Sequence, residues 1–220
     1  PIADGTIYNI LKDNKSAARF TPQTLTGMIK ELDYNNVTLV PKIDKIGNRI
    51  TIAGAGIIKD YKLIGYLNEI ENRALAFIKN KLKLELIDLE YEDGLLSYNV
   101  TDTESSKDVS VDKEIHVDIK INMEGYLQGY IMGKDINVFD NDILMGMEKA
   151  IEKKIKKEVE NVISKSQKEY NADFIGIGEY LSKYHPKEWK AIKDNWDEIY
   201  PDIKFNTIVK AKIRRTGLTK

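Results

Sequence analysis

The chain has 220 residues, of which 42% are hydrophobic and 31% are charged, a composition that is ordinary for a globular protein able to bury a core. Lys and Arg total 34 against 35 for Asp and Glu, so the net charge gives no general attraction to nucleic acid. The absence of cysteine excludes disulfides, thiolate catalysis and sulfur-ligated zinc.

The start of the chain carries no targeting signal that we recognise. It opens at Pro1 without an initiator Met, so we expect a fragment or a processed product. No signal peptide is evident, and no apolar run approaches the roughly 20 residues that span a bilayer.

Residues 1–80 predict a smaller α+β unit that begins with a helix at 22–32. Thr21 can cap this helix and Pro22 suits its first position. The β-rich run that follows the helix should stop at Pro41.

A hairpin and a short helix should complete this unit. Two apolar runs flank a Lys-Asp-Tyr-Lys turn and predict a hairpin over 50–67, in which Gly54 indicates a bulge or a close backbone approach. Asn68 and Glu71 have the spacing of a capping box and predict a helix at 69–78. This helix should bury Ile70, Ala74, Phe77 and Ile78.

Residues 81–220 predict a C-terminal α+β domain whose main feature is a long strand at 109–124. Apolar and polar side chains alternate at every step of this stretch, and only Lys113 breaks the apolar row. Successive side chains of a strand point to opposite faces, so one face should be dry and the other wet, as in an antiparallel sheet covered on one side. The dry face should carry Val109, Val111, Ile115, Val117, Ile119, Ile121 and Met123.

Three further strands should join this sheet. Alternating residues predict strands at 82–89 and 95–101, separated by a turn, while 101–108 looks like a polar linker. A closing strand at 203–215 should lie beside the long one.

A helix at 141–170 is the second strong signal. Its apolar residues recur at intervals of three or four, and about 30 residues correspond to about 45 Å of helix. The apolar stripe is too narrow for a fully buried helix, so we expect the helix to lie across the dry face of the sheet. A second amphipathic helix is predicted at 186–199, with Trp189, Ile192, Trp196 and Ile199 on one side.

No catalytic, cofactor-binding or metal-ligating residue is predicted. His116 shares the wet face of the long strand with Glu114 and Asp118, at about 6–7 Å between neighbouring side chains, which would allow a metal site. A solvated polar face is the preferred interpretation. His185 precedes Pro186 and is interpreted as a cap or loop residue.

Two glycine pairs, in 54–56 and 176–178, begin like phosphate-binding loops, but neither continues as a dinucleotide or P-loop motif. Turns and tight packing explain them better. No Gly-x-Ser-x-Gly elbow for a serine nucleophile is present. Trp189 and Trp196 are interpreted as core residues in preference to a ligand platform.

A basic cluster on the long helix is the one candidate surface, formed by Lys153, Lys154, Lys156 and Lys157. It could face an anionic membrane or a partner. The preferred interpretation is a solvated helix face with internal pairing, as between Glu152 and Lys156.

Two stretches taken together carry a family pattern. The first, 54–69, has an apolar hairpin with a Lys59-Asp60 turn, a Gly65 exit and an acidic helix. The second reads Asp-x-apolar-Gly-apolar-Gly over 173–178, followed by a Pro-x-x-Trp…Trp pattern. From about residue 40 onward, the set and its order resemble the Ger(x)C spore germination proteins, the C subunits of spore germinant receptors.

The chain departs from this family pattern at three places. Ile58 stands where an aromatic residue is usual, and Tyr66 stands where Trp is common. The N-terminal region with its lipid-bearing cysteine is absent.

The resemblance implies the C-terminal part of a lipoprotein that is tethered to the outer surface of the spore inner membrane. Its implied partners are the integral membrane A and B subunits, with no cofactor and no nucleic acid. We therefore expect a non-enzymatic receptor subunit that serves as a scaffold or interaction module, with this fragment itself soluble. The alternatives are a small-molecule or peptide binder with a pocket between the two units, and a metal-assisted hydrolase built around His116.

Overall fold

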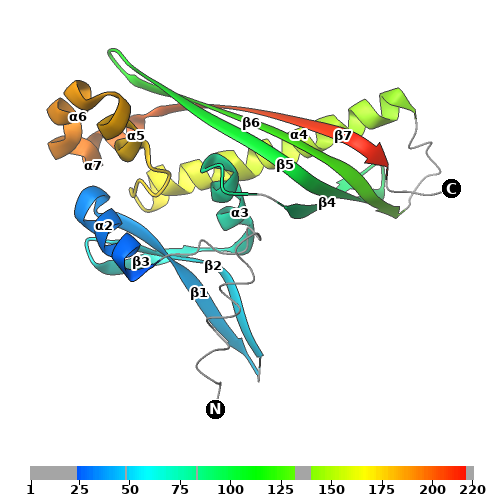
Figure 1. The fold of residues 1–220 in the computed structure, drawn as a ribbon, viewed down its shortest axis with the longest axis horizontal. Helices are drawn as coiled ribbons and strands as arrows, with labels where there is room; N and C mark the ends of the chain where they lie inside the picture. The colour runs from blue at the N-terminus through cyan, green and yellow to red at the C-terminus, as the bar shows by residue number, and fades with distance from the viewer. Residues whose placement is uncertain (1–23, 48, 83, 132–139, 217–220) are drawn as a thin grey trace.

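The computed structural model describes residues 24–47, 49–82, 84–131 and 140–216. Figure 1 shows two separate β-sheets, with the long helix α4 along the larger sheet and the shorter helix α3 between the two. The smaller sheet has the antiparallel order β1-β2-β3, and the larger has the order β4-β5-β6-β7. The α+β fold class is confirmed.

The N-terminal elements agree with the prediction in kind, but their ends differ. They are α2 (Leu25–Asn35), β1 (Val37–Ile46), β2 (Arg49–Lys59), β3 (Lys62–Leu67) and α3 (Glu69–Ile78). Thr24 is the N-cap of α2, and its side chain accepts a hydrogen bond from Gly27 N at 3.1 Å. The proposed cap at Thr21 and Pro22 lies outside the described residues.

The expected stop at Pro41 is wrong, because β1 continues to Ile46. β1 is an edge strand, and its register shifts between Pro41 and Ile43. An edge strand at an irregularity tolerates a residue without a backbone N–H.

The predicted hairpin is confirmed. Asp60 and Tyr61 form its two-residue turn with φ of +48° and +61°, as a type I′ turn requires. Gly54 has φ +81°, and a Cβ there would clash with the carbonyl oxygen of Leu67. The glycine therefore marks a close backbone approach.

The capping box of α3 is also confirmed. Glu71 N donates to Asn68 Oδ1 at 2.9 Å, and Asn68 N donates to Glu71 Oε2 at 2.7 Å. Ala74, Phe77 and Ile78 are buried, but Ile70 is 50% exposed, so its predicted burial is wrong. Ile70 lies on the same side of α3 as Ala74 and Phe77, but it is in the first turn, ahead of the buried residues of the helix, which begin at Asn72.

The C-terminal elements include a helix that we did not predict, α5. They are β4 (Glu85–Tyr91), β5 (Gly94–Val111), β6 (Ile115–Ile131), α4 (Asn141–Ser164), α5 (Ile177–Tyr184), α6 (Pro186–Ile192), α7 (Trp196–Ile199) and β7 (Lys204–Thr216).

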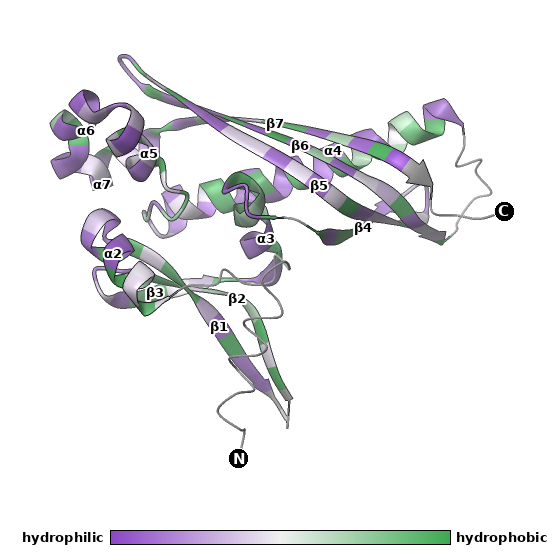
Figure 2. Cartoon of the chain, in the orientation of Figure 1, coloured by the Kyte–Doolittle hydropathy of each residue, from purple (hydrophilic) through white to green (hydrophobic). Residues whose placement is uncertain are grey.

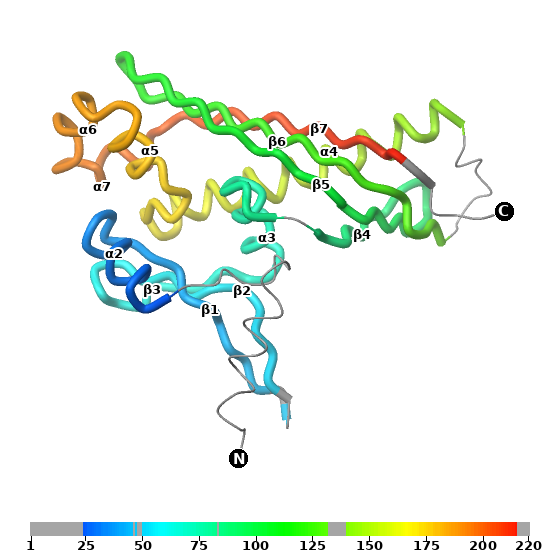
Figure 3. Tube along the Cα trace, viewed as in Figure 1, coloured from blue at the N-terminus to red at the C-terminus, as the bar shows by residue number. Residues whose placement is uncertain are grey.

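The alternating stretch 109–124 is a hairpin and not a single strand. It turns at 112–114, where Lys113 had broken the apolar row. Val111 pairs with Ile115 and Val109 with Val117. Directly paired residues of an antiparallel hairpin point to the same face of the sheet, so the apolar residues of both strands lie on one dry face. Figure 3 shows β5 and β6 running side by side along this hairpin.

The predicted linker at 101–108 is part of strand β5. Its inward positions are polar, and two of them find partners in neighbouring loops. Thr103 Oγ1 donates to Leu82 O at 2.7 Å, and Lys107 Nζ donates to Ile175 O at 3.4 Å. At these positions hydrogen bonds take the place of the apolar contacts that an alternating strand pattern predicts.

The larger sheet is mixed and not purely antiparallel. β7 lies beside β6 as predicted, but the two strands are parallel. The chain leaves β6, returns through α4 and α5–α7, and enters β7 in the same direction, which is the crossover that parallel pairing requires.

Helix α4 covers the dry face of the sheet, as predicted. Met147, Ile151, Ile155 and Val159 are fully buried, in one cluster with Val117 and the other apolar residues of β6. Figure 2 shows the apolar and polar bands along α4 and the strands that this packing separates.

Both edge strands of the sheet approach α4. Glu152 Oε1 accepts from Ala211 N at 3.1 Å and Glu148 Oε1 from Ile213 N at 2.9 Å, along the outer edge of β7. On the opposite edge, the Tyr91 side chain of β4 lies against Gly146. The sheet therefore curls around the helix, and α4 protects part of an edge that could otherwise pair with another chain.

The predicted helices at 141–170 and 186–199 have the expected bounds to within one residue, but neither is a continuous α-helix. The last turn of the first is a π-helix at Lys165–Glu169, in which Tyr170 N donates to Lys165 O. The second is interrupted by a 3₁₀ turn at Lys193–Asn195, which separates α6 from α7.

The two sheets share one continuous core that is linked through α3. Arg73 Nη2 donates to both carboxylate oxygens of Glu158 at 2.8 Å, joining α3 to α4. Lys165 Nζ lies 2.8 Å from Glu71 Oε1 and adds a second tie. The division of the chain at residue 80 remains a proposal.

Candidate functional site

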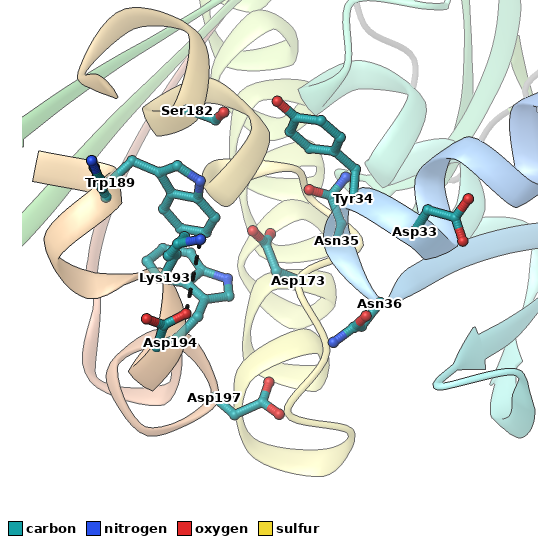
Figure 4. Close-up of a pocket in the computed structure, with 12 residues that line it drawn as sticks. Asp33, Tyr34, Asn35, Asn36, Asp173, Ser182, Trp189, Lys193, Asp194 and Asp197 are labelled. Carbon is teal, nitrogen blue, oxygen red and sulfur yellow. Dashed lines mark ion pairs between the residues drawn. The ribbon is translucent and has the colours of Figure 1, made fainter. Parts of the chain in front are cut away.

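A cleft of about 640 Å³ separates the end of α2 from the segment that contains α5, α6 and α7. Figure 4 shows Tyr34 and Asn35 on one wall, Trp189, Lys193 and Asp194 on the other, and Asp173 between them. This volume is typical of small-molecule sites. The lining residues are Asp33, Tyr34, Asn35, Asn36, Asp173, Ser182, Trp189, Lys190, Lys193, Asp194, Trp196 and Asp197.

One wall of the cleft is aromatic. The rings of Trp189 and Trp196 meet edge to face, with centroids 5.0 Å apart and an interplanar angle of 78°. A Cβ on residue 178 would lie 2.9 Å from Trp189 Cη2, so Gly178 is what allows this indole to pack on α5. Both indoles are half-buried, and each has part of its ring packed on the core and part at the cleft.

Asp173 organises the floor of the cleft. Its carboxylate accepts hydrogen bonds from the backbone N–H groups of Gly176, Ile177 and Gly178 at 2.8, 3.1 and 2.6 Å. Gly176, with φ +86°, makes the turn that aims these donors at one side chain. Burial raises the pKa of Asp173, while the three donors and the nearby Lys107 oppose the rise.

Lys59 joins the N-terminal hairpin to the far side of the cleft. Its ammonium donates to the carbonyl oxygen of Asn171 at 2.7 Å and to Asp197 Oδ1 at 2.9 Å. Asn171 Nδ2 in turn donates to the carbonyl oxygen of Asp197 at 2.8 Å. The side chain of Lys59 is only 14% exposed, so this cation is held between the two units.

The cleft continues into a second cavity of about 420 Å³ on the other side of Tyr34, Asn35 and Ser182. Lys30, Glu31, Glu179 and Lys183 line its remaining walls. Tyr34 is 69% exposed and stands between the two cavities.

The basic cluster of the long helix lies on α4, away from the residues that line this cleft. Lys153, Lys156 and Lys157 are exposed, whereas Lys154 is half-buried and lies 3.1 Å from Glu158. The expected Glu152–Lys156 pair is wrong: Lys156 lies 3.7 Å from Glu160, and Glu152 accepts from the backbone of β7.

The histidines are not gathered into a site. His116 Nε2 lies 3.7 Å from Glu114 Oε2, and Asp118 accepts from Asn206 Nδ2 at 2.7 Å. Over the ranges that the structure describes, no three His, Cys, Asp or Glu side chains are grouped as metal ligands. His185 occupies the position between α5 and α6, as expected of a loop or cap residue.

Sequence reasoning missed most of the cleft. The family motifs contain Lys59, Asp173, Trp189 and Trp196, but nothing in the residues shows that they meet. The polar residues 33–36 of the opposite wall carry no signal except the end of a helix. None of the described helices has both the length and the apolar character of a membrane-spanning segment.

Comparison with known proteins places these motifs in a family context. The family model described as "Spore germination B3/ GerAC like, C-terminal" matches residues 53–217. Spore germination protein YndF of Bacillus subtilis (strain 168) is 26% identical over 219 residues, covering 94% of this chain and 52% of that protein. Spore germination protein A3 of the same organism is 29% identical over 215 residues, covering 94% and 58%. The chain therefore spans little more than half the length of these relatives.

The fold has a solved counterpart. The crystal structure of the GerBC protein superposes with a TM-score of 0.78 at 20% identity, covering 88% of this chain and 61% of that one. At this identity the likeness supports the fold alone.

Proposed function

Because the chain belongs to the spore germination B3/GerAC-like family, we propose that it is the C-terminal part of a germinant-receptor C subunit acting in nutrient-triggered germination. In this role it is a non-enzymatic scaffold or interaction module. A lipid anchor outside this chain would tether the parent protein to the outer surface of the spore inner membrane, beside the integral membrane A and B subunits.

The observation that carries this proposal is the family match over residues 53–217. The geometry supports it, because the motif residues build a single body. Lys59, at the end of β2, donates to Asp197 of α7. Asp173 accepts from the backbone of the loop before α5, and one hydrophobic core includes residues of both sheets. A body of this kind can present fixed surfaces to neighbouring subunits.

The test is assembly with the membrane subunits. The tagged parent protein is expressed with the A and B subunits of the same organism, and the complex is isolated in detergent. We expect all three proteins to elute together in constant ratio. Recovery of the parent protein alone, at subunit concentrations that saturate a control receptor, would overturn the scaffold role.

The cleft favours a second candidate, a small-molecule or peptide binder at the junction of the two units. It has the volume of a ligand site and an aromatic wall. A ligand that prefers the folded state raises the melting temperature, so a panel of germinants should include one that does so. No shift with any of them would argue against direct sensing.

The exposed lysines of α4 could orient the parent protein on an anionic bilayer. Each exposed cation near such a surface contributes about 1 kcal/mol, and salt screens the attraction. Binding to anionic vesicles that is lost at high salt would support this orientation. Equal recovery on neutral and anionic vesicles would exclude it.

A further inference from the structure

One wall of the cleft is held by few buried contacts. It consists of residues 186–199, which form α6, the 3₁₀ turn and α7. The structure describes this whole segment, and none of its residues is buried. Its apolar side chains are half-buried against the core and are those of Trp189, Ile192, Trp196 and Ile199. A segment with few buried apolar contacts opens at a lower free energy than the core does.

Both ends of this segment are firmly anchored. On one side, α5 buries Ile177 and Leu181 in the core. On the other side Tyr200 is buried, and Gln167 Nε2 donates to the carbonyl oxygens of Tyr200 and Ile203 at 2.9 and 3.0 Å. Residues 186–199 therefore form a strap between two fixed points.

The strap forms half of the cleft lining. Six of the twelve lining residues belong to it, namely Trp189, Lys190, Lys193, Asp194, Trp196 and Asp197. Figure 4 shows this wall across the cleft from Tyr34 and Asn35. The 3₁₀ turn at Lys193–Asn195 interrupts the helical wall at its middle, and such a turn within a helix often marks a hinge. Displacement of the strap changes the width of the cleft.

Asp197 connects this wall to the turn between β2 and β3. Its Oδ1 accepts from the Lys59 ammonium group at 2.9 Å, and its carbonyl oxygen accepts from Asn171 Nδ2 at 2.8 Å. The Asp197 side chain is 66% exposed, so water competes with Lys59 for the carboxylate. Lys59 also donates to the carbonyl oxygen of Asn171 at 2.7 Å, so it keeps one acceptor when the Asp197 carboxylate leaves.

The turn between β2 and β3 is itself bonded to the opposite wall. Asp60 N donates to the carbonyl oxygen of Asn36 at 2.9 Å, and the Tyr61 hydroxyl donates to Asp33 Oδ1 at 2.6 Å. Asn36 and Asp33 line the cleft at the end of α2. The contact with Asp197 therefore links one wall of the cleft to a turn that is fixed on the other wall.

We propose that residues 186–199 are a lid over the cleft, which the Lys59–Asp197 contact holds closed and which opens while both sheets stay folded. The lid moves about its two ends, next to His185 and Tyr200, and carries both indoles with it. This inference rests on the second candidate function, because a lid has a task only where the cleft admits a ligand. It does not depend on the scaffold role.

Acrylamide quenching of tryptophan fluorescence measures the lid directly, because both tryptophans of the chain lie in it. Asp197→Ala removes the contact with Lys59 at an exposed position, so the far-UV circular dichroism should stay unchanged. We expect the quenching of the two indoles to rise about twofold, because the lid is then open in a larger fraction of molecules.

Two control variants belong with this measurement. Glu198→Ala is the matched control, because Glu198 is the neighbouring exposed acidic residue of α7 and has no ion pair with any described residue. Glu104→Gln, on the open face of the larger sheet, is the remote control. Both should leave the quenching at the wild-type value. Equal quenching in Asp197→Ala and Glu198→Ala would overturn the proposal.

Hydrogen exchange shows whether the opening is local. In Asp197→Ala the amides of residues 186–199 should exchange about threefold faster than in wild type, while those of α5 and β6 keep the wild-type rates. Faster exchange in all three regions would contradict a lid, because the contact would then belong to the cooperative core.

A separate readout distinguishes the lid from the function on which it rests. A germinant that raises the melting temperature, together with unchanged quenching in Asp197→Ala, would overturn the lid and leave the binder. A lid that responds to Asp197→Ala, with no shift by any germinant, would support the motion and count against the binder.

Discussion

The ammonium group of Lys59 lies 2.9 Å from Asp197 Oδ1, although 138 residues separate them in the chain. This contact joins the turn between β2 and β3 to α7 and so fixes one side of the cleft. Lys59→Met should destabilise the protein by about 1–2 kcal/mol, because it removes two charge-assisted hydrogen bonds. Urea unfolding measures the loss. Lys62→Met, at the exposed end of the same hairpin, is the control, and equal losses would contradict the tie.

The Arg73–Glu158 pair should be sensitive to the loss of either partner. Glu158 is 9% exposed, so Arg73→Met leaves a buried carboxylate with only Lys154 nearby, at 3.1 Å. We expect a loss of about 3 kcal/mol for the single change and a return to within about 1 kcal/mol of wild type in Arg73→Met/Glu158→Leu. A double-mutant cycle by urea unfolding checks this. Additive losses would show that the pair does not couple α3 to α4.

Two glycines of β6 should respond in opposite ways to alanine. A Cβ on Gly125 would clash with the backbone carbonyl of Asn99, whereas a Cβ on Gly129 would meet no atom within 4 Å. Gly125→Ala should therefore lose about 2–3 kcal/mol. Gly129→Ala should be neutral or gain up to about 1 kcal/mol, because the unfolded chain loses freedom. Thermal melts of the two variants test this prediction. A similar melting temperature for both would show that Gly125 is not packed tightly against the Asn99 backbone.

Lys79 should make stability depend on pH above neutrality. Burial lowers its pKa to about 8, which the attraction of Glu31 and Asp173 only partly offsets, and Lys81 and Lys107 lower it further. The unfolded chain, with a lysine pKa of about 10.4, then binds more protons between these values, so stability rises with pH across this window. We expect a rise of about 1–3 kcal/mol from pH 8 to pH 10, discounted because the residue keeps some solvent contact.

The comparison for this prediction is Lys79→Met, which should be more stable than wild type near neutral pH. The difference should shrink as the pH approaches about 10.4, because the wild-type lysine then loses its charge in both states. Other lysines and tyrosines titrate in the same range, so the difference between the two proteins is the informative quantity. Parallel curves of stability against pH for the two proteins would show that folding does not lower the pKa of Lys79.

Apolar periodicity was enough to predict the elements that make the large core. The stripe from Met147 to Val162 on α4 and the alternation on β6 each face one partner, so the pattern in the sequence matches burial in the structure. The capping box at Asn68 was predictable because it is a local contact.

The sequence predictions are wrong where the alternation of apolar residues does not determine the structure. The turn at 112–114 contains no Gly, Pro or Asn, and the paired residues on either side keep the alternation intact. Strand β5 continues through inward polar residues such as Thr103, which are satisfied by loop carbonyls. The direction of β7 depends on the path of the chain through α4–α7, which its own alternation does not encode.

The cleft could not be predicted because it is assembled from segments 33–36 and 173–197 that meet only in the folded chain. Its residues are polar and aromatic, so their spacing resembles that of ordinary loops and short helices. The resemblance to a family identified the motif residues, but only the folded structure shows that they lie around one cleft.

Germination of spores that carry cleft variants tests most directly whether the cleft acts in nutrient-triggered germination. In a spore-forming host whose own copy is deleted, the parent protein is supplied as wild type, as Tyr34→Ser/Asp194→Asn, or as the control Glu104→Gln. We predict that the cleft variant germinates about tenfold more slowly on nutrient, at equal protein level and equal melting temperature, while the control matches wild type. Wild-type germination by the cleft variant would contradict a role for the cleft and leave only the scaffold role.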